Sequence, residues 1–246
     1  MAGLERAGTG RSGKRMVPLP SLSLRHRLAI LVAAELLVWV VSRLALQVFD
    51  WRSSEMELFR TGLRVATAWL CWHLFSDLIR SGQPRQGTLK SAPVVLGLTF
   101  FFTIPVLVGN YQLSLQMAWV FALTSVVVAI KEEFLWRGVV QNLLRERFGT
   151  LKAVLLTSLV FALWHFGSWE NSVWMYVEVF TASVIIGLVY VISGSMLAVI
   201  VIHTAYDALY SFTPLISPPL NQNFGFIPLL FALALIYGSW HRRPPP

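Results

Sequence analysis

A short charged run interrupts an otherwise apolar segment in the middle of the sequence. Lys131, Glu132 and Glu133 follow the apolar residues 119–130, and Arg137 comes four positions after Glu133. On an α-helix this spacing brings Glu133 and Arg137 to one face within salt-bridge reach, while Glu132 points about 100° away. Apolar residues resume after the run, so the charges lie inside the hydrophobic helix. The pattern therefore indicates a functional carboxylate rather than a membrane boundary.

Two histidines in later apolar segments each have a partner four positions away. Phe161 precedes His165, and His203 precedes Asp207. These i, i+4 spacings place each pair on one helix face. A lone histidine in an apolar helix is more often a satisfied structural group than a catalyst, so the depth of these residues decides how they are interpreted.

Four of these ionisable residues are predicted to lie at a similar depth on three helices. Counted at about 1.5 Å per residue, Glu132 and His165 each lie roughly 20 Å from the adjoining basic loop. On the same scale, His203 and Asp207 lie roughly 12 and 18 Å from the turn at 193–195. Unrelated polar residues would seldom be so nearly level. We therefore expect the four residues to form one site.

Two carboxylates and two imidazoles in a water-accessible site suit hydrolysis. A glutamate can act as general base on water, one imidazole can hold that water, and a histidine N–H can stabilise an oxyanion. The same groups can ligate a divalent metal such as zinc, with Glu132, His165 and His203 as candidate ligands. A metal-free mechanism is equally consistent with the residues. The sequence contains no H-E-x-x-H motif and no G-x-S-x-G motif, which argues against zincin-type and serine hydrolase sites.

The elements that position these residues are predicted to be transmembrane helices. Hydrophobic residues make up 56% of the 246 positions and charged residues 13%, where soluble domains have about half and a quarter. Spans of roughly twenty apolar residues are long enough to cross a bilayer. Eight such stretches are present, at about 28–49, 62–79, 92–109, 113–136, 151–167, 173–192, 196–212 and 224–240. The sequence therefore predicts an all-α, polytopic membrane bundle over 28–241, preceded by a basic cytoplasmic tail, 1–27.

The distribution of basic residues predicts the topology of this bundle. Fourteen Lys and Arg residues lie in the tail, the second and fourth loops and the C-terminal end, against two in the intervening set of loops. The positive-inside rule then places both termini in the cytoplasm, in a multi-pass protein of the plasma or inner membrane. The net charge of +8 is explained by contacts with anionic lipid rather than nucleic acid. A single cysteine, Cys71, excludes an internal disulfide and a thiolate metal cluster.

Three motifs in the second half of the chain resemble those of the CPBP intramembrane protease family. They are Glu-Glu-x-x-x-Arg at 132–137, Phe-x-x-x-His at 161–165 and His-x-x-x-Asp at 203–207, in the family's order. The family includes the type II CAAX prenyl endopeptidases and bacterial abortive-infection proteins. The resemblance implies an eight-helix bundle with a cavity open to the cytosol and cleavage of peptide bonds within or beside the membrane.

The resemblance also implies roles for individual residues. Glu132 would activate water and His165 would help to hold it, with Glu133 and Arg137 orienting the helix. The third motif, His203 and Asp207, would serve the oxyanion or hold the histidine in place. In this family the third motif often ends in Asn, whose amide can donate to an oxyanion. An ionised Asp207 cannot, although it can orient the histidine.

Two other classes of function stay open on the sequence alone. The same bundle can serve as a non-catalytic scaffold or immunity protein, and mid-membrane Glu, His and Asp also suit a proton relay or transporter. No inverted repeat or broken helix pair favours a transporter. The expected substrate is a membrane peptide or a lipidated protein, prenylated or not.

Overall fold

The computed structural model describes residues 22–50, 53–81, 114–165, 173–212 and 237, and these are helical apart from short connections. The helices are α1 (Leu24–Ala45), α2 (Ser54–Ser81), α4 (Leu115–Glu133), the π-helix η1 (Phe134–Gln141), α5 (Asn142–Phe148), α6 (Thr150–Trp164), α7 (Val173–Ser193) and α8 (Met196–Phe212). No strand occurs among the described residues, so the all-α prediction is confirmed there. The predicted spans 92–109 and nearly all of 224–240 lie outside these residues.

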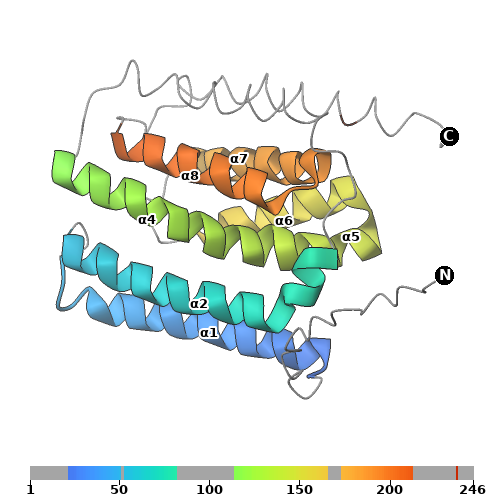
Figure 1. Ribbon diagram of the computed structural model, residues 1–246, viewed down its shortest axis with the longest axis horizontal. Coiled ribbons are helices and arrows are strands. Elements are labelled where there is room, and N and C mark those ends of the chain that lie inside the picture. The colour runs from blue at the N-terminus through green and yellow to red at the C-terminus, as the bar shows by residue number, and fades with distance from the viewer. Residues whose placement is uncertain (1–21, 51–52, 82–113, 166–172, 213–236, 238–246) are drawn as a thin grey trace, which may run out of the picture.

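The helix α4 lies at the centre of the arrangement. It packs against α2 on one side and α8 on the other, and α1 forms a hairpin with α2 (Figure 1). The remaining layer is made by α6 and α7, which pack on one another. The helix α4 thus packs directly on α8, and α6 packs on η1, the continuation of α4.

The helix α1 has the character of a membrane-spanning element. It is the one helix of the described part that is both long and apolar enough to cross a bilayer. Only Leu31 and Glu35 of α1 are buried, while large apolar side chains such as Leu37 and Leu44 are exposed. A helix that is apolar on its exposed side suits contact with lipid. Shorter apolar helices occur within α6, α7 and α8.

The segment 115–148 is one continuous helical path, so the charged run lies inside a helix as predicted. The sequence did not predict that its middle, η1, is a π-helix. Such segments insert an extra residue into a helical turn and are frequent at functional sites. The path ends at Gly149, whose φ of 76° lies in the left-handed region that glycine adopts without strain.

Close helix packing requires a small residue at one position of η1. A Cβ atom on Gly138 would lie 2.7 Å from Ile79 Cγ1 of α2 and 3.3 Å from Met196 Cε of α8. Both distances are below ordinary van der Waals contact. Gly138 therefore allows α2 and α8 to approach the helix that carries the first motif.

A kink in α2 is coupled to an ion pair with α1. Phe75 has non-helical dihedral angles, φ −131° and ψ 16°. The neighbouring carbonyl of Leu74 accepts a hydrogen bond from Arg27 Nη1 at 2.7 Å, and the same nitrogen contacts Asp77 Oδ1 at 2.9 Å. The arginine thus binds a carbonyl group close to the kink and joins the two helices there.

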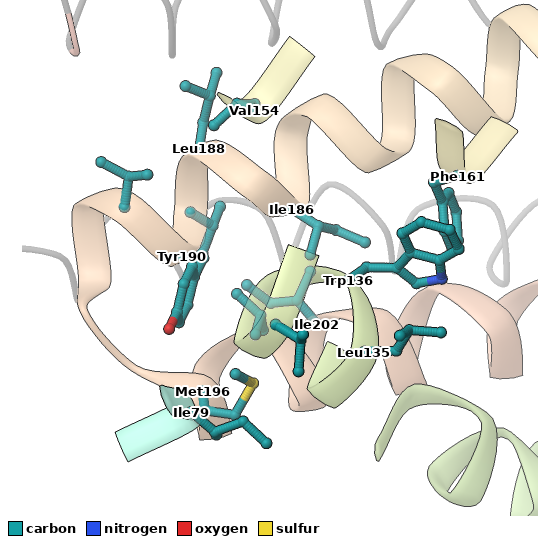
Figure 2. Packing of buried hydrophobic residues seen from close by; sticks show 14 of the residues in the cluster. Ile79, Leu135, Trp136, Val154, Phe161, Ile186, Leu188, Tyr190, Met196 and Ile202 are labelled. Carbon is teal, nitrogen blue, oxygen red and sulfur yellow. The ribbon is translucent and has the colours of Figure 1, made fainter. Parts of the chain in front are cut away.

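The hydrophobic core lies between η1 and the helices around it. Figure 2 shows its side chains, which come from α2, η1, α6, α7 and α8. Labelled members are Ile79, Leu135, Trp136, Val154, Phe161, Ile186, Leu188, Tyr190, Met196 and Ile202. Fully burying one such side chain contributes about 1.5–3 kcal/mol. The predicted site residue Phe161 is part of this core, so the core and the site share a wall.

Candidate active site

His203 of α8 lies among three carboxylates. Its Nδ1 is 2.6 Å from Glu133 Oε1, and its Nε2 is 3.5 Å from Asp207 Oδ2 and 3.8 Å from Glu132 Oε2. The side chains of Glu133 and His203 are buried, whereas those of Glu132 and Asp207 are 17% and 28% exposed. The two ring nitrogens therefore have different surroundings. Nδ1 is fixed by a buried carboxylate, and Nε2 is directed toward two accessible carboxylates.

Glu133 is held in turn by a buried arginine. Arg137 Nε lies 3.2 Å from Glu133 Oε2, and both side chains are fully buried. Arg137 Nη2 also donates to the carbonyl and hydroxyl oxygens of Ser183 on α7, at 2.9 and 3.1 Å. The predicted i, i+4 salt bridge is therefore present, and it links α4 and η1 to both α7 and α8. Removing one partner of a buried pair typically costs about 3–5 kcal/mol.

The second motif fixes the orientation of His165. Its Nδ1 lies 2.8 Å from the Phe161 carbonyl oxygen. Because a carbonyl can only accept, Nδ1 must carry the proton and donate, which leaves Nε2 of the neutral ring as an acceptor. The Phe161 ring packs edge-on against the imidazole at 4.6 Å, and the Arg137 guanidinium lies 5.3 Å from the same ring. Phe161 therefore contacts both His165 and the buried arginine.

Glu132 is the partly exposed carboxylate of the first motif. It interacts electrostatically with His165, His203 and Lys131. Its Oε2 lies 3.8 Å from His203 Nε2, so Glu132 and Glu133 both reach the same imidazole, while Glu133 also pairs with Arg137. The structure thus brings Glu132, His203 and Asp207 together, with His165 close enough to Glu132 to interact with it.

Two ion pairs, one buried and one partly buried, were not predicted from the sequence. Lys131 Nζ lies 2.7 Å from Glu35 Oε2 of α1, and Arg64 Nη1 lies 2.6 Å from Glu57 Oε1 within α2. Thr124 of α4 donates to the same Glu57 oxygen at 3.0 Å. Charged residues in apolar segments predict that each has a partner, but they do not identify that partner.

A series of polar contacts between η1, α5 and α7 was also missed. Gln141 Nε2 donates to the Gly187 carbonyl at 3.2 Å, and Asn142 Nδ2 lies 3.2 Å from the Tyr190 hydroxyl. A Cβ on Gly187 would lie 2.9 Å from Gln141 Oε1, so the close approach depends on that glycine. Together with Arg137, these side chains attach the helix of the first motif to α7.

A metal site needs several ligands that converge on one point. Within the described part of the chain, no three His, Cys, Asp or Glu side chains form a group that could hold a metal ion. His203 Nδ1 is bound by Glu133, while its Nε2 lies 3.5 Å from Asp207 and 3.8 Å from Glu132. A metal ion held by Glu132, His165 and His203 stays a prediction, and the mechanism proposed below uses only side chains of the protein.

One segment of the chain matches a known protein family. Residues 114–209 match the family described as type II CAAX prenyl endopeptidase Rce1-like. This segment runs through α4, η1, α5, α6, α7 and most of α8, and it contains every predicted site residue. No curated protein and no solved structure gives a significant match. The match confirms the resemblance drawn from the three motifs.

Proposed function

Starting from the Rce1-like character of residues 114–209, we propose that this protein is an intramembrane endopeptidase. Its substrates would be peptide bonds of membrane-associated or lipidated peptides, reached from the cytosol. The observation that carries the proposal is the pairing of two neighbouring glutamates with opposite environments. Glu133 is fully buried and bound to Arg137, whereas Glu132 is partly exposed and faces His203.

Glu132 is the residue we assign to activating water. Glu133 already binds both Arg137 and His203 and has no exposed surface, so it cannot reach a water molecule in contact with substrate. Glu132 takes a proton from water while the water oxygen bonds to the carbonyl carbon of the substrate. It then returns the proton to the departing nitrogen as the C–N bond breaks. His165, with Nε2 as an acceptor, holds the second hydrogen of the water.

His203 is the residue we assign to the oxyanion. When both its nitrogens carry protons, Nδ1–H donates to Glu133 and Nε2–H is directed toward the accessible side of the site. A donor placed where charge develops stabilises the tetrahedral intermediate. Asp207, a carboxylate 3.5 Å from Nε2, attracts the protonated ring and so orients it. This assignment gives Asp207 a positioning role that does not require it to donate.

The test is cleavage of a quenched-fluorescence peptide library by purified protein in nanodiscs. Wild type would be compared with Glu132→Gln and His165→Ala, each with and without a strong chelator. Glu146→Gln is the matched control because Glu146 is an exposed glutamate on α5, away from the site. We expect both site variants to lose cleavage and the control to keep it.

Three outcomes have distinct meanings. Loss in the variants but not with chelator supports water activated by Glu132 alone. Loss with chelator as well would show that cleavage requires a metal ion. Full biological activity of Glu132→Gln would refute the protease and favour a scaffold or immunity protein.

A further inference from the structure

The residue that precedes Glu132 is paired with a helix outside the family-matched segment. Lys131 Nζ donates to Glu35 Oε2 of α1 at 2.7 Å, and the two side chains are only 10% and 7% exposed. Glu35 and Leu31 are the two buried residues of α1. Charges in apolar surroundings are costly unless they are paired. The ion pair therefore joins α1 to α4 at the position next to Glu132.

Three consecutive charged residues of α4 are directed to different surroundings. Successive residues of an α-helix point about 100° apart, so Lys131 and Glu133 project from nearly opposite sides, about 160° apart. Lys131 binds Glu35 of α1, and Glu133 contacts His203 of α8 at 2.6 Å. Glu132 projects between these two contacts and is 17% exposed. The helix is thus held on both sides of the residue assigned to activating water.

The rotation of α4 about its axis decides where the Glu132 carboxylate lies. The π-helix η1 begins at Phe134, directly after the three charges, so the α-helical register of α4 is not continued downstream. A carboxylate lies roughly 6 Å from the helix axis, so a rotation of about 20° would move it by about 2 Å. Misplacing a reacting group by about 1 Å can cost roughly 100-fold in rate. Contacts that fix this rotation therefore bear directly on the activity of Glu132.

We propose that Lys131 and Glu35 are positioning residues for Glu132. Their ion pair fixes the rotation of α4 from the α1 side, as Glu133 fixes it from the α8 side. This inference rests on the proposed endopeptidase activity. It extends the functional unit to α1, which lies outside residues 114–209. Both residues act through the backbone of α4, so their removal should lower kcat without weakening substrate binding.

The first experiment replaces both charges with apolar residues, in the double variant Glu35→Leu with Lys131→Met (the apolar pair). Exchanging a buried ion pair for apolar side chains of similar volume often leaves stability unchanged or raises it, but it removes the directional contact. We expect the apolar pair to stay folded in nanodiscs with a Tm close to that of wild type. Its kcat for the peptide cleaved by wild type should fall roughly 100-fold, with KM nearly unchanged. A role in stability alone would not produce this loss.

The second experiment exchanges the two charges between the helices. Glu35→Lys and Lys131→Glu each place like charges together and should lower kcat at least as far as the apolar pair does. The double variant restores an ion pair between α1 and α4, and its kcat should recover about tenfold over either single variant. Asp77→Asn is the matched control, because it removes an ion pair that joins α1 to α2 instead. The control should retain wild-type kcat.

The outcomes separate this inference from the proposed activity. A folded apolar pair with wild-type kcat, or with a change in KM alone, would overturn the inference. If the apolar pair does not fold, Glu35→Gln decides, because it keeps the size of the side chain but removes its charge. Wild-type kcat in that variant would also overturn the inference. Cleavage by Glu132→Gln at the wild-type rate would instead refute the endopeptidase itself, whatever the Glu35 and Lys131 variants do.

Discussion

Nδ1 of His203 lies 2.6 Å from Oε1 of Glu133, so the histidine of α8 is held by the second glutamate of the first motif rather than the first. Arg137 binds the other oxygen of Glu133 at 3.2 Å. Two adjacent glutamates on one helix therefore have separate tasks. The buried one fixes the imidazole, and the accessible one, Glu132, remains able to act on water.

This separation predicts different consequences for two matched substitutions. Glu133→Gln leaves the buried Arg137 without its carboxylate and should destabilise the protein by about 3–5 kcal/mol, with loss of activity. Glu132→Gln should abolish cleavage while changing stability by less than about 1 kcal/mol, because Glu132 is partly exposed. Thermal unfolding in nanodiscs measures the difference. Equal losses of stability would contradict the assignment of the two glutamates.

Asp207 provides a second prediction, since we assign it to orienting His203. Asp207→Asn keeps the size of the side chain but loses the charge that attracts the protonated imidazole, so we expect kcat to fall about tenfold, or about 1.4 kcal/mol. Asp207→Ala also removes the side chain that lies against the ring and should lower kcat further. Steady-state kinetics of the folded variants measures the order of their kcat values. An asparagine variant faster than wild type would instead favour an amide that donates to the oxyanion.

The packing around Gly138 predicts an effect on stability. Gly138→Ala places a methyl group 2.7 Å from Ile79 Cγ1 and should cost about 1–3 kcal/mol through overpacking. The double variant Gly138→Ala with Ile79→Ala should recover part of that loss relative to the sum of the single changes. Gly62→Ala on α2 is the control, because its Cβ would meet nothing within 4 Å. If the effects of Gly138→Ala and Ile79→Ala on stability are additive, the contact with Ile79 is not the cause of the loss.

The predicted topology is checked by labelling introduced cysteines in intact cells. Cys71 is buried, and a Cys71→Ser background removes it as a target. Ser12→Cys and Ser81→Cys should be protected from a membrane-impermeant maleimide until the cells are opened. Ser54→Cys, at the start of α2, should react at once. Labelling of Ser12→Cys in intact cells would reverse the orientation inferred from the basic residues.

Relationships within one helix could be predicted from the sequence. The Glu133–Arg137 pair follows from i, i+4 spacing, and the divergence of Glu132 follows from the rotation per residue. The depth of each site residue in the membrane stays a prediction from the rise of its own helix. These features depend on local geometry, which the spacing of residue types records.

Relationships between helices could not be predicted in the same way. Nothing in the spacing indicates that His203 would bind Glu133 rather than Glu132, or that Lys131 would bind Glu35. Such pairs depend on how far each helix is rotated about its axis when it packs. The π-helix η1 adds a further rotation that straight α-helical counting omits. Many of the charged residues that hold the site in place could therefore be identified from the sequence, but their partners could not.

The π-helix makes the first motif sensitive to chain length as well as to residue identity. An extra residue in η1 shifts the helix upstream, which carries Glu132 and Glu133, by about a quarter turn relative to the helix downstream. The upstream face meets α8, and the downstream side chains of Gln141 and Asn142 meet α7. Deleting a single residue of η1 after Arg137 would leave the first motif intact, yet the two faces could no longer contact α7 and α8 together. The extra residue thus sets the rotation of the helix before η1 relative to the helix after it. Inserting or deleting one residue in η1 should therefore abolish activity as completely as loss of a site residue.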